Sequence, residues 1–382
     1  MTIVSGPWIA APGTQAVLAL LGAGGHQAYA VGGCVRNALL GMPVTDVDIA
    51  TDATPEQVLH LAAGAEIRAV PTGIDHGTVT LVYDGTGYEV TTFRDDVETD
   101  GRHAVVRFST DVATDAARRD FTMNALYADR FGAVLDPLGG LPDVLARHVR
   151  FIGDPRDRIR EDYLRILRFF RFSAWYGDPA LGLDADALDG IARSLDGLEQ
   201  LSRERVGAEI VKLAGAPDPA PALAAMARCG VLGALLPGAV PETVAPLVHF
   251  EQEAGLPPSP MRRLACLGLN GTEDLRFSRS DAKALALLAA AIGADAGLAE
   301  LAWRHGAGLA QDVAVLRAAV IGGPLPSDWQ TQIARGAAAE FPIKAADLMP
   351  EFQGPALGAR LAALERAWIS SGFQSTRKDL LN

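Results

Sequence analysis

Cysteine is scarce in this sequence, and long apolar runs are missing. The cysteines among the 382 residues are Cys34, Cys229 and Cys266. Their odd number and wide spacing exclude a disulfide framework or a cysteine zinc site, as is typical of a reducing compartment. No run of about 18 apolar residues occurs, so we expect no membrane span. The first residues, MTIVSGPWIA, lack the basic stretch of a secretory signal. We therefore expect a cytoplasmic protein.

Positive charge is also in deficit overall, but it is concentrated in one stretch. The net charge is −12, which argues against a general coat for polyanions. Arginines nevertheless gather at Arg147, Arg150, Arg156, Arg158, Arg160, Arg165, Arg168 and Arg171. A local basic stretch in an acidic protein indicates a focused anion site.

The periodicity predicts an α+β fold. Residues 1–136 alternate predicted strands and helices. Helices are predicted over 13–24, 34–41 and 54–64, strands over 27–33 and 44–51, and a hairpin over 77–94. Thr54 and Pro55 mark a helix start. Residues 95–112 are predicted to be mobile, and 115–128 and 154–177 to be single helices. We predict a small head domain over 1–136, a helical neck over 137–213 and an all-helical body and tail over 214–382.

Three acidic residues form a candidate metal site. Asp46 and Asp48 are two residues apart on a predicted strand, so both side chains point to the same face. Glu89, on a neighbouring predicted strand, is a candidate third acid. Two carboxylates on one face can hold Mg²⁺ ions, although a solvated strand face is the simpler interpretation of the pattern alone.

Two further segments carry candidate phosphate contacts. Gly32 and Gly33 lie between a predicted strand and a predicted helix, where a tight turn lets phosphate approach the backbone. Arg36 is expected in the first turn of that helix, where a cation is poorly placed for the helix dipole. The segment RRDFTMNAL adds Arg118, Arg119, Asp120 and Asn124. Asp120 suits a helix cap, whereas the paired arginines suit a triphosphate or a ribose.

The segment EDYLRILRFFRF, residues 161–172, predicts an amphipathic helix that carries one acid and three arginines opposite an apolar stripe. Glu161 precedes Arg165 by four residues and is predicted to pair with it, which leaves Asp162 available. An acceptor beside a fixed donor matches the pairing edge of cytosine and adenine and mismatches guanine and uracil. A surface ion-pair ladder is the alternative. Arg168 and Arg171 complete the polar face.

These segments, in this order, resemble the motifs of the class II CCA-adding tRNA nucleotidyltransferase / poly(A) polymerase family. The quoted stretches are YAVGGCVRNALLG, TDVDIATDATPEQV, GTVTLVYDGTGYEVTTFRDD, RRDFTMNAL, DPLGGLPDVLARHVRFIGDP, REDYLRILRFFRF and SRERVGAEIVKL. The resemblance runs from about residue 27 to residue 213. One departure is Asn37, where the family usually has Asp.

The resemblance implies a polymerase-β-like nucleotidyltransferase head followed by an elongated all-α neck, body and tail. It implies template-independent addition of CCA to tRNA 3′ ends from CTP and ATP, with Mg²⁺ held by Asp46 and Asp48. It also implies triphosphate and sugar contacts from Gly33, Arg36 and Arg119. Base reading falls to Asp162 and Arg165, and further nucleotide contacts to Arg168 and Arg171.

Three other functions remain open at this point. A poly(A) polymerase shares the head, but the acidic balance disfavours binding to arbitrary RNA. A CC-adding relative would be shortened in the stretch from Arg94 to Asp111, which is well filled here. A non-catalytic RNA-binding protein would have no use for the acids and the base-reading pair.

Overall fold

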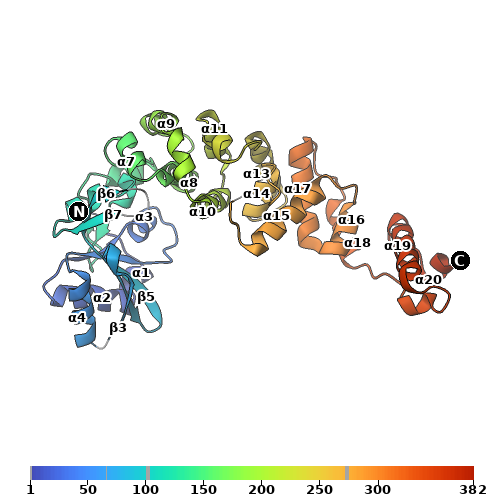
Figure 1. Ribbon diagram of the computed structural model, residues 1–382, viewed down its shortest axis with the longest axis horizontal. Coiled ribbons are helices and arrows are strands. Elements are labelled where there is room, and N and C mark those ends of the chain that lie inside the picture. Colours follow the sequence, from blue (N-terminus) through green and yellow to red (C-terminus); the bar gives the residue numbers. More distant parts are fainter. Residues whose placement is uncertain (1, 66, 100–103, 272–274) are drawn as a thin grey trace. The chain divides into compact units, whose positions relative to one another are not determined.

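The computed structural model describes residues 2–65, 67–99, 104–271 and 275–382. The chain divides into two compact units, Met1–Pro237 and Gly238–Asn382, which are described separately below (Figure 1). Every helix among the described residues is too short or too polar to span a bilayer. A mixed α/β part followed by helices agrees with the predicted α+β fold class.

A seven-stranded sheet forms the centre of the first unit, with the strand order β3-β4-β5-β2-β1-β8-β9. Its strands are β1 (Ala28–Val31), β2 (Asp48–Thr51), β3 (Arg68–Gly73), β4 (Thr78–Tyr83), β5 (Thr86–Thr92), β8 (Tyr127–Ala128) and β9 (Val134–Leu135). The pair β2–β5 is parallel, and the other pairs are antiparallel. The parallel pair places the first residue of β2 beside the middle of β5.

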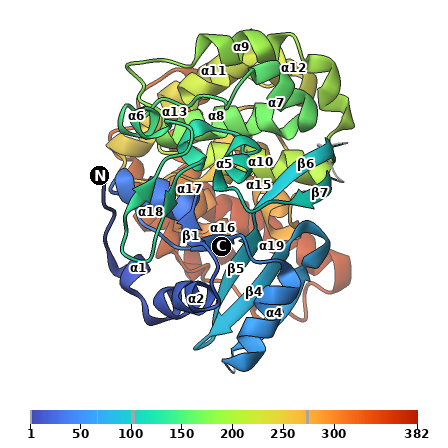
Figure 2. The same ribbon diagram turned by 90° about the vertical axis from the view of Figure 1, so that its left-hand side faces the viewer.

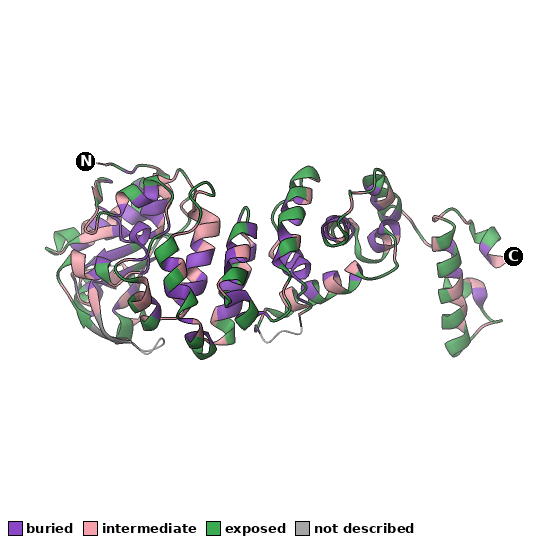
Figure 3. Ribbon diagram, turned by 90° about the horizontal axis from the view of Figure 1, so that it is seen from above, coloured by how far each residue is buried: buried purple, intermediate pink, exposed green. Residues whose placement is uncertain are grey.

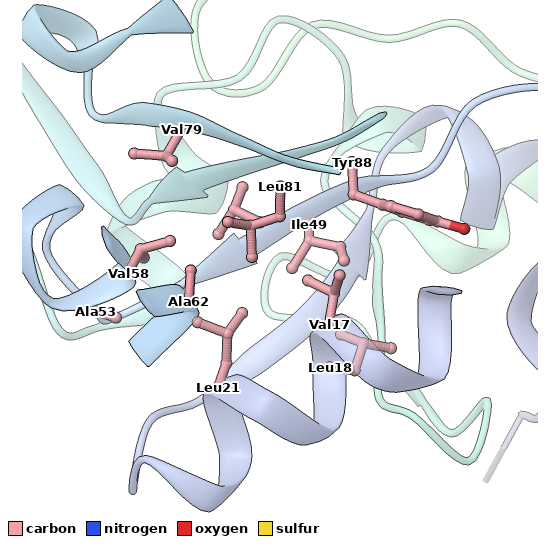
Figure 4. Close-up of a cluster of buried hydrophobic side chains, with 11 residues drawn as sticks. Val17, Leu18, Leu21, Ile49, Ala53, Val58, Ala62, Val79, Leu81 and Tyr88 are labelled. Carbon is pink, nitrogen blue, oxygen red and sulfur yellow. The ribbon is translucent and has the colours of Figure 1, made fainter. Parts of the chain in front are cut away.

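Alternation along the strands divides this sheet into two apolar faces. On one face, α2 (Pro12–Ala23) and α4 (Pro55–Gly64) pack through Leu21 and Val58 against Ile49 and Val90 (Figure 4). On the other face, Ala50 and Tyr127 pack with Ala116 of α5 (Val112–Ala117). Asp48 is two residues before Ala50 on β2, so its side chain points to this second face.

Local sequence signals explain the elements that were predicted correctly. Thr54 caps α4 and forms a capping box with Gln57, as the sequence around Pro55 predicts. The predicted hairpin is β4–β5, and its turn residues Asp84 and Gly85 have φ of 46° and 76°. Such a two-residue turn matches the twist of the flanking strands.

Helices make up the rest of the first unit, and several of them contact α8 (Leu164–Tyr176). Helices α7, α10 and α11 contact α8, and α7 also contacts α9 (Figure 2). The other α-helices not yet introduced are α1 (Pro7–Ala10), α3 (Gly33–Leu39), α6 (Leu141–Leu145), α7 (Pro155–Glu161), α9 (Ala185–Ala192), α10 (Arg203–Ala214), α11 (Ala220–Arg228) and α12 (Val231–Leu235). The 3₁₀ helices are η1 (Ile74–His76), η2 (Thr122–Asn124) and η3 (Leu195–Gln200).

The stretch predicted to be mobile contains two paired strands. β6 (Arg94–Thr99) and β7 (Ala104–Phe108) form an antiparallel ribbon. The ribbon pairs backbone groups of this polar stretch with one another, and the mobility of the stretch stays a prediction. Gly101, at the centre of that prediction, lies outside the described residues.

The predicted helix over 115–128 is also wrong. α5 ends at Ala117, and η2 and β8 replace the rest of it. The backbone here bonds to distant partners instead of its own turn. The Thr122 N–H donates to the Arg150 carbonyl at 3.0 Å, and Tyr127 pairs with Val31. Tertiary hydrogen bonds thus override the helical propensity of this segment.

The predicted single helix over 154–177 is broken at Asp162. This residue has φ −156° and ψ 106°, which is extended backbone between α7 and α8. Its Oδ1 accepts a hydrogen bond from the Leu164 N–H at 3.1 Å and so satisfies a free donor at the start of α8. The apolar stripe is nevertheless as predicted at Ile166, Leu167 and Phe170, which are buried, whereas Tyr163 is half-buried.

The second unit is entirely helical among its described residues, in line with the sequence pattern. Its α-helices are α13 (Val244–Glu253), α14 (Pro260–Cys266), α15 (Arg279–Ile292), α16 (Leu298–His305), α17 (Ala307–Ile321), α18 (Trp329–Ala337), α19 (Gly354–Ser370) and α20 (Arg377–Leu381), and its 3₁₀ helices are η4 (Pro241–Thr243) and η5 (Ala345–Leu348). These helices bury one side and expose the other (Figure 3). Buried Glu251 pairs with Arg262 and Arg263. Trp368 centres a last apolar cluster.

Candidate active site

Two of the predicted metal-binding acids lie side by side on the inner strands β2 and β5. The parallel register of β2 and β5 pairs Asp48 with Glu89 and pairs Ile49 with Val90. The apolar pair is buried on one face, so the two exposed carboxylates share the opposite face. Asp46 lies in the loop before β2, not on the strand as predicted, and its Oδ2 accepts a hydrogen bond from the Thr45 hydroxyl at 2.9 Å.

The electrostatics of these acids suit a cation. Asp48 is exposed by surface area, but the surrounding protein partly desolvates its carboxyl. This desolvation, with the charges of Glu89 and Asp46, raises the pKa of the carboxyl, and Arg119 lowers it only in part. A divalent ion would relieve this like-charge repulsion, and carboxylate oxygens are ligands that Mg²⁺ accepts. No three His, Cys, Asp or Glu side chains among the described residues already form a metal-holding group.

A glycine turn lies next to Asp48, because Val31, the residue before Gly32, pairs with Asp48 in the sheet. Gly32 precedes α3 with φ 71° and ψ −113°, a conformation that strains any other residue. Gly33 begins the helix. Arg36 is the fourth of the seven residues of α3, so it belongs to the first turn, as predicted, and equally to the last turn.

The Arg36 side chain is buried and directed into the protein. Its guanidinium donates to the Asn124 Oδ1 at 2.5 Å and to the Tyr176 hydroxyl at 2.9 Å. It also lies 3.9 Å from the centre of the Tyr176 ring, within range of a cation–π interaction. Burial lowers its pKa. Arg36 therefore fixes the glycine turn against α8.

Arg119 connects the glycine turn with the acids. Its Nη2 pairs with the Asp115 Oδ2 at 2.9 Å, and its Nε donates to the Tyr127 hydroxyl at 3.2 Å. A Cβ placed on Gly32 would lie 3.5 Å from its Nη1. The guanidinium is thus held beside the turn while its charge acts on Asp48.

Asp120 is not the helix cap that the sequence suggests, because no helix begins there. It is buried, and its Oδ2 accepts hydrogen bonds from the Arg168 Nε at 2.8 Å and Nη2 at 2.5 Å. Its Oδ1 accepts from the Asn124 amide at 2.8 Å and from the Phe121 N–H at 2.8 Å. Burial raises the pKa of this carboxyl, but Arg168 and these donors outweigh burial, so the pKa is low.

Replacing Asp120 by alanine should lower the free energy of unfolding by about 2–4 kcal/mol, because Arg168 and Asn124 would lose their shared acceptor. Asp120→Asn retains one acceptor oxygen and should cost less. Urea unfolding at neutral pH measures both values. Equal stability of the alanine variant and the wild type would contradict the role of Asp120 as the centre of this network.

The neck residues have more protein partners than the sequence indicates. Arg165 pairs with Glu161, as predicted, and donates to the Arg118 carbonyl at 3.0 Å. Asp162 does not brace Arg165, as predicted, but it has a partner that the sequence did not indicate, because its Oδ2 accepts from the Arg205 Nη2 at 2.6 Å.

Arg171 lies outside the Asp120 network. Its Nε pairs with the buried Glu209 Oε2 at 2.6 Å, on α10. The structure thus joins Arg36, Asn124, Asp120 and Arg168 in one hydrogen-bonded chain and places Arg171 on a separate ion pair.

Comparison with known proteins relates both parts of the first unit to one family. Residues 28–150 match the model "Poly A polymerase head domain", and residues 181–242 match "Probable RNA and SrmB- binding site of polymerase A". The "CCA-adding enzyme" of Geobacillus stearothermophilus is 41% identical over 216 residues, which are 56% of this chain and 52% of that protein. Residues 28–242 thus resemble the class II CCA-adding / poly(A) polymerase family.

A human relative and a solved structure show the same similarity. The human "CCA tRNA nucleotidyltransferase 1, mitochondrial" is 42% identical over 189 residues, 49% of this chain and 44% of that protein. The chain spans about half the length of the curated relatives it matches. A crystal structure of the Bacillus stearothermophilus CCA-adding enzyme in complex with CTP is 29% identical and has a TM-score of 0.74, covering 94% of this chain and 92% of that one. The predicted polymerase-β-like head and helical remainder are confirmed.

Four residues that hold the site together were not predicted from the sequence. They are Asp115, Tyr176, Arg205 and Glu209. The last two lie in SRERVGAEIVKL, whose family resemblance was noted without assigning roles to them. Asn37, the departure from the family pattern, accepts from the Arg36 Nη2 at 2.9 Å. Asn thus keeps the acceptor and removes only a charge.

Proposed function

We propose that this chain adds C, C and A to the 3′ ends of tRNA, using CTP and ATP and releasing pyrophosphate. The observation that most supports it is the register of Asp48 against Glu89, beside a fixed Arg119. Acids for metal ions next to a cation for phosphate are the groups that nucleotidyl transfer needs. The similarity to this family favours tRNA as the acceptor.

Mg²⁺ is the proposed cofactor, with Asp46 and Asp48 as ligands and Glu89 as a third acid. When bound, Mg²⁺ would neutralise the triphosphate and favour ionisation of the primer hydroxyl. Arg119, Gly32 and Gly33 would orient the triphosphate, since their place beside Asp48 is fixed by protein contacts. The raised pKa of Asp48 is what a carboxylate awaiting a cation would show.

Asp162 and Arg165 are the proposed readers of the base. Asp162 would accept from the amino group of C or A, and Arg165 would donate to the neighbouring ring nitrogen. G and U present the reverse order and would leave these groups unpaired, which is costly. Arg168 and Arg171 would support the nucleotide, and Arg36, Asp120 and Asn124 would hold the frame behind it.

The proposed division of labour follows the predicted domains. Residues 1–136 would form the catalytic head, 137–213 the neck that reads the base, and 214–382 the body and tail that hold tRNA. A cytoplasmic location is proposed from the cysteine content.

One experiment separates the proposal from its alternatives. The purified protein is incubated with Mg²⁺, with each NTP alone and in pairs, and with tRNA lacking one, two or three 3′ nucleotides. Addition that stops at CCA supports the proposal. Long A tails would indicate a poly(A) polymerase, a stop after CC would indicate a CC-adding enzyme, and tRNA binding without addition would indicate a non-catalytic protein.

Deletion of residues 96–102 tests how the ribbon of β6 and β7 contributes. We expect the two C additions to persist and the final A addition to fall at least about tenfold, because a sequence with little apolar content suits closure over the nucleotide better than core support. The measurement compares CTP incorporation on tRNA lacking CCA with ATP incorporation on tRNA ending in CC. Equal loss of all three steps, in a variant that melts like the wild type, would contradict this role.

A further inference from the structure

The break between α7 and α8 fixes the Asp162 carboxylate from two sides. Its Oδ1 accepts from the Leu164 N–H at 3.1 Å, and its Oδ2 accepts from the Arg205 Nη2 at 2.6 Å. The first partner belongs to its own turn, whereas the second comes from α10. The direction of this carboxylate therefore depends on where α10 lies.

The next residue, Tyr163, is seated against η3. A Cβ built on Gly197 would lie 1.8 Å from the Tyr163 Cε1 and 2.0 Å from its Cδ1, so the ring occupies the space that any larger residue would need. Gly197 is not among the glycines with positive φ. Glycine is thus required here for space, not for its backbone conformation, and η3 sets the position of the residue adjoining Asp162.

Arg165, the donor of the proposed base-reading pair, is held by other contacts than those of Asp162 and Tyr163. Arg165 is fixed by Glu161, by the Arg158 carbonyl at 2.9 Å and by the Arg118 carbonyl at 3.0 Å. None of these groups belongs to η3 or α10. A disturbance at Gly197 or Arg205 should therefore move the acceptor and leave the donor in place.

We propose that Gly197 and Arg205 are positioning residues that set nucleotide selectivity through Asp162, an inference that rests on the proposed function. Arg205 directs the carboxylate, and Gly197 allows the Tyr163 ring to seat so that Asp162 remains beside Arg165. Once the acceptor turns away, the amino group of cytosine loses its partner, and the carbonyl of uracil meets less repulsion. The selectivity for CTP over UTP then falls.

The test uses the full chain with Gly197→Ala, Arg205→Gln and Arg205→Lys. The matched control is Gly233→Ala, the same change in α12, where a Cβ meets no atom within 4 Å. The readouts are the ratio of kcat/KM for CTP to that for UTP on tRNA lacking CCA, the ratio of the two equilibrium Kd values, and a thermal melt. We expect Gly197→Ala and Arg205→Gln to lower both ratios about tenfold, the effect of one misplaced charged hydrogen bond. Arg205→Lys should fall between, and Gly233→Ala should match the wild type.

A purely structural role would lower the melting temperature and leave both ratios unchanged, and that result would overturn the inference. Should Gly197→Ala fail to fold, the two Arg205 variants decide. A wild type that adds no nucleotide would refute the proposed function alone. The Kd ratio then still decides: a CTP preference lost in Arg205→Gln supports the inference, and one ratio shared by all proteins overturns it.

Discussion

Asp46→Ala and Asp48→Ala should each lower nucleotide addition by a factor of at least about 100, because the charge that develops in phosphoryl transfer would lose its metal support. tRNA binding should change little, since the helical body is proposed to hold the tRNA. The measurement is single-turnover CTP incorporation on tRNA lacking CCA, together with an equilibrium binding assay. Wild-type turnover in either variant would refute the assignment of these acids as ligands.

Two controls separate metal binding from folding. Asp75→Ala removes another exposed carboxylate of the same unit, on η1, and should leave addition unchanged. Asp48→Asn removes only the charge. Because the pKa of Asp48 is raised in the folded protein, stability falls as the pH rises through that pKa and the carboxyl ionises, and asparagine removes this cost. The metal-free Asn variant should therefore melt no lower than the wild type, and Mg²⁺ should raise the melting temperature of the wild type more. An equal rise in both would count against Asp48 as a ligand.

The predictions from sequence succeed where a signal and its effect lie close together in the chain. Thr54 with Pro55, and Asp84 with Gly85, determine a helix start and a hairpin turn within a few residues. The alternation around Glu89 likewise fixes the face on which it lies. The register that brings it to Asp48 is a parallel pairing between strands far apart in the sequence, which no local pattern could give.

The failures share a different physical cause, which is hydrogen bonding to groups far away in the sequence. The segment from Arg118 to Ala128 carries helical propensity, yet Thr122 bonds to Arg150 and Tyr127 bonds in the sheet. In the neck, a helical wheel assumes an unbroken helix. Asp162 interrupts it by bonding Leu164 and Arg205. Propensity sums cannot reveal such competition, because they contain no distant partner.

Asp162 and Arg165 each have an ion-pair partner, and these partners affect any variant that exchanges the acceptor and the donor. Asp162→Arg would place a second cation beside Arg205, and Arg165→Asp would place a second acid beside Glu161. Like charges at such distances destabilise each other. The double exchange alone is therefore handicapped, and adding Arg205→Glu with Glu161→Arg restores an opposite charge at both places.

With the pair reversed, the donor and acceptor order matches G and U instead of C and A. The double variant should lose C and A addition and gain weak use of G and U, and the fourfold variant should gain more. Each reversed hydrogen bond to a charged group contributes about 1.5–3 kcal/mol, so the preference between CTP and UTP should shift by at least about tenfold. Asp162→Ala alone should reduce the discrimination between nucleotides more than it reduces the stability of the fold, because buried Ile166, Leu167 and Phe170 are unchanged.

The measurement is the relative kcat/KM for the four NTPs on tRNA lacking CCA, alongside a thermal melt of each variant. If Asp162 and Arg165 were only part of an ion-pair ladder on the neck, their exchange would change the melting temperature slightly and leave nucleotide choice at the wild-type ratio. The extended backbone at Asp162 argues against a ladder, because a ladder needs an unbroken helix to keep its charges in register. A fourfold variant that folds and still prefers C and A over G and U at the wild-type ratio would show that the base is read elsewhere.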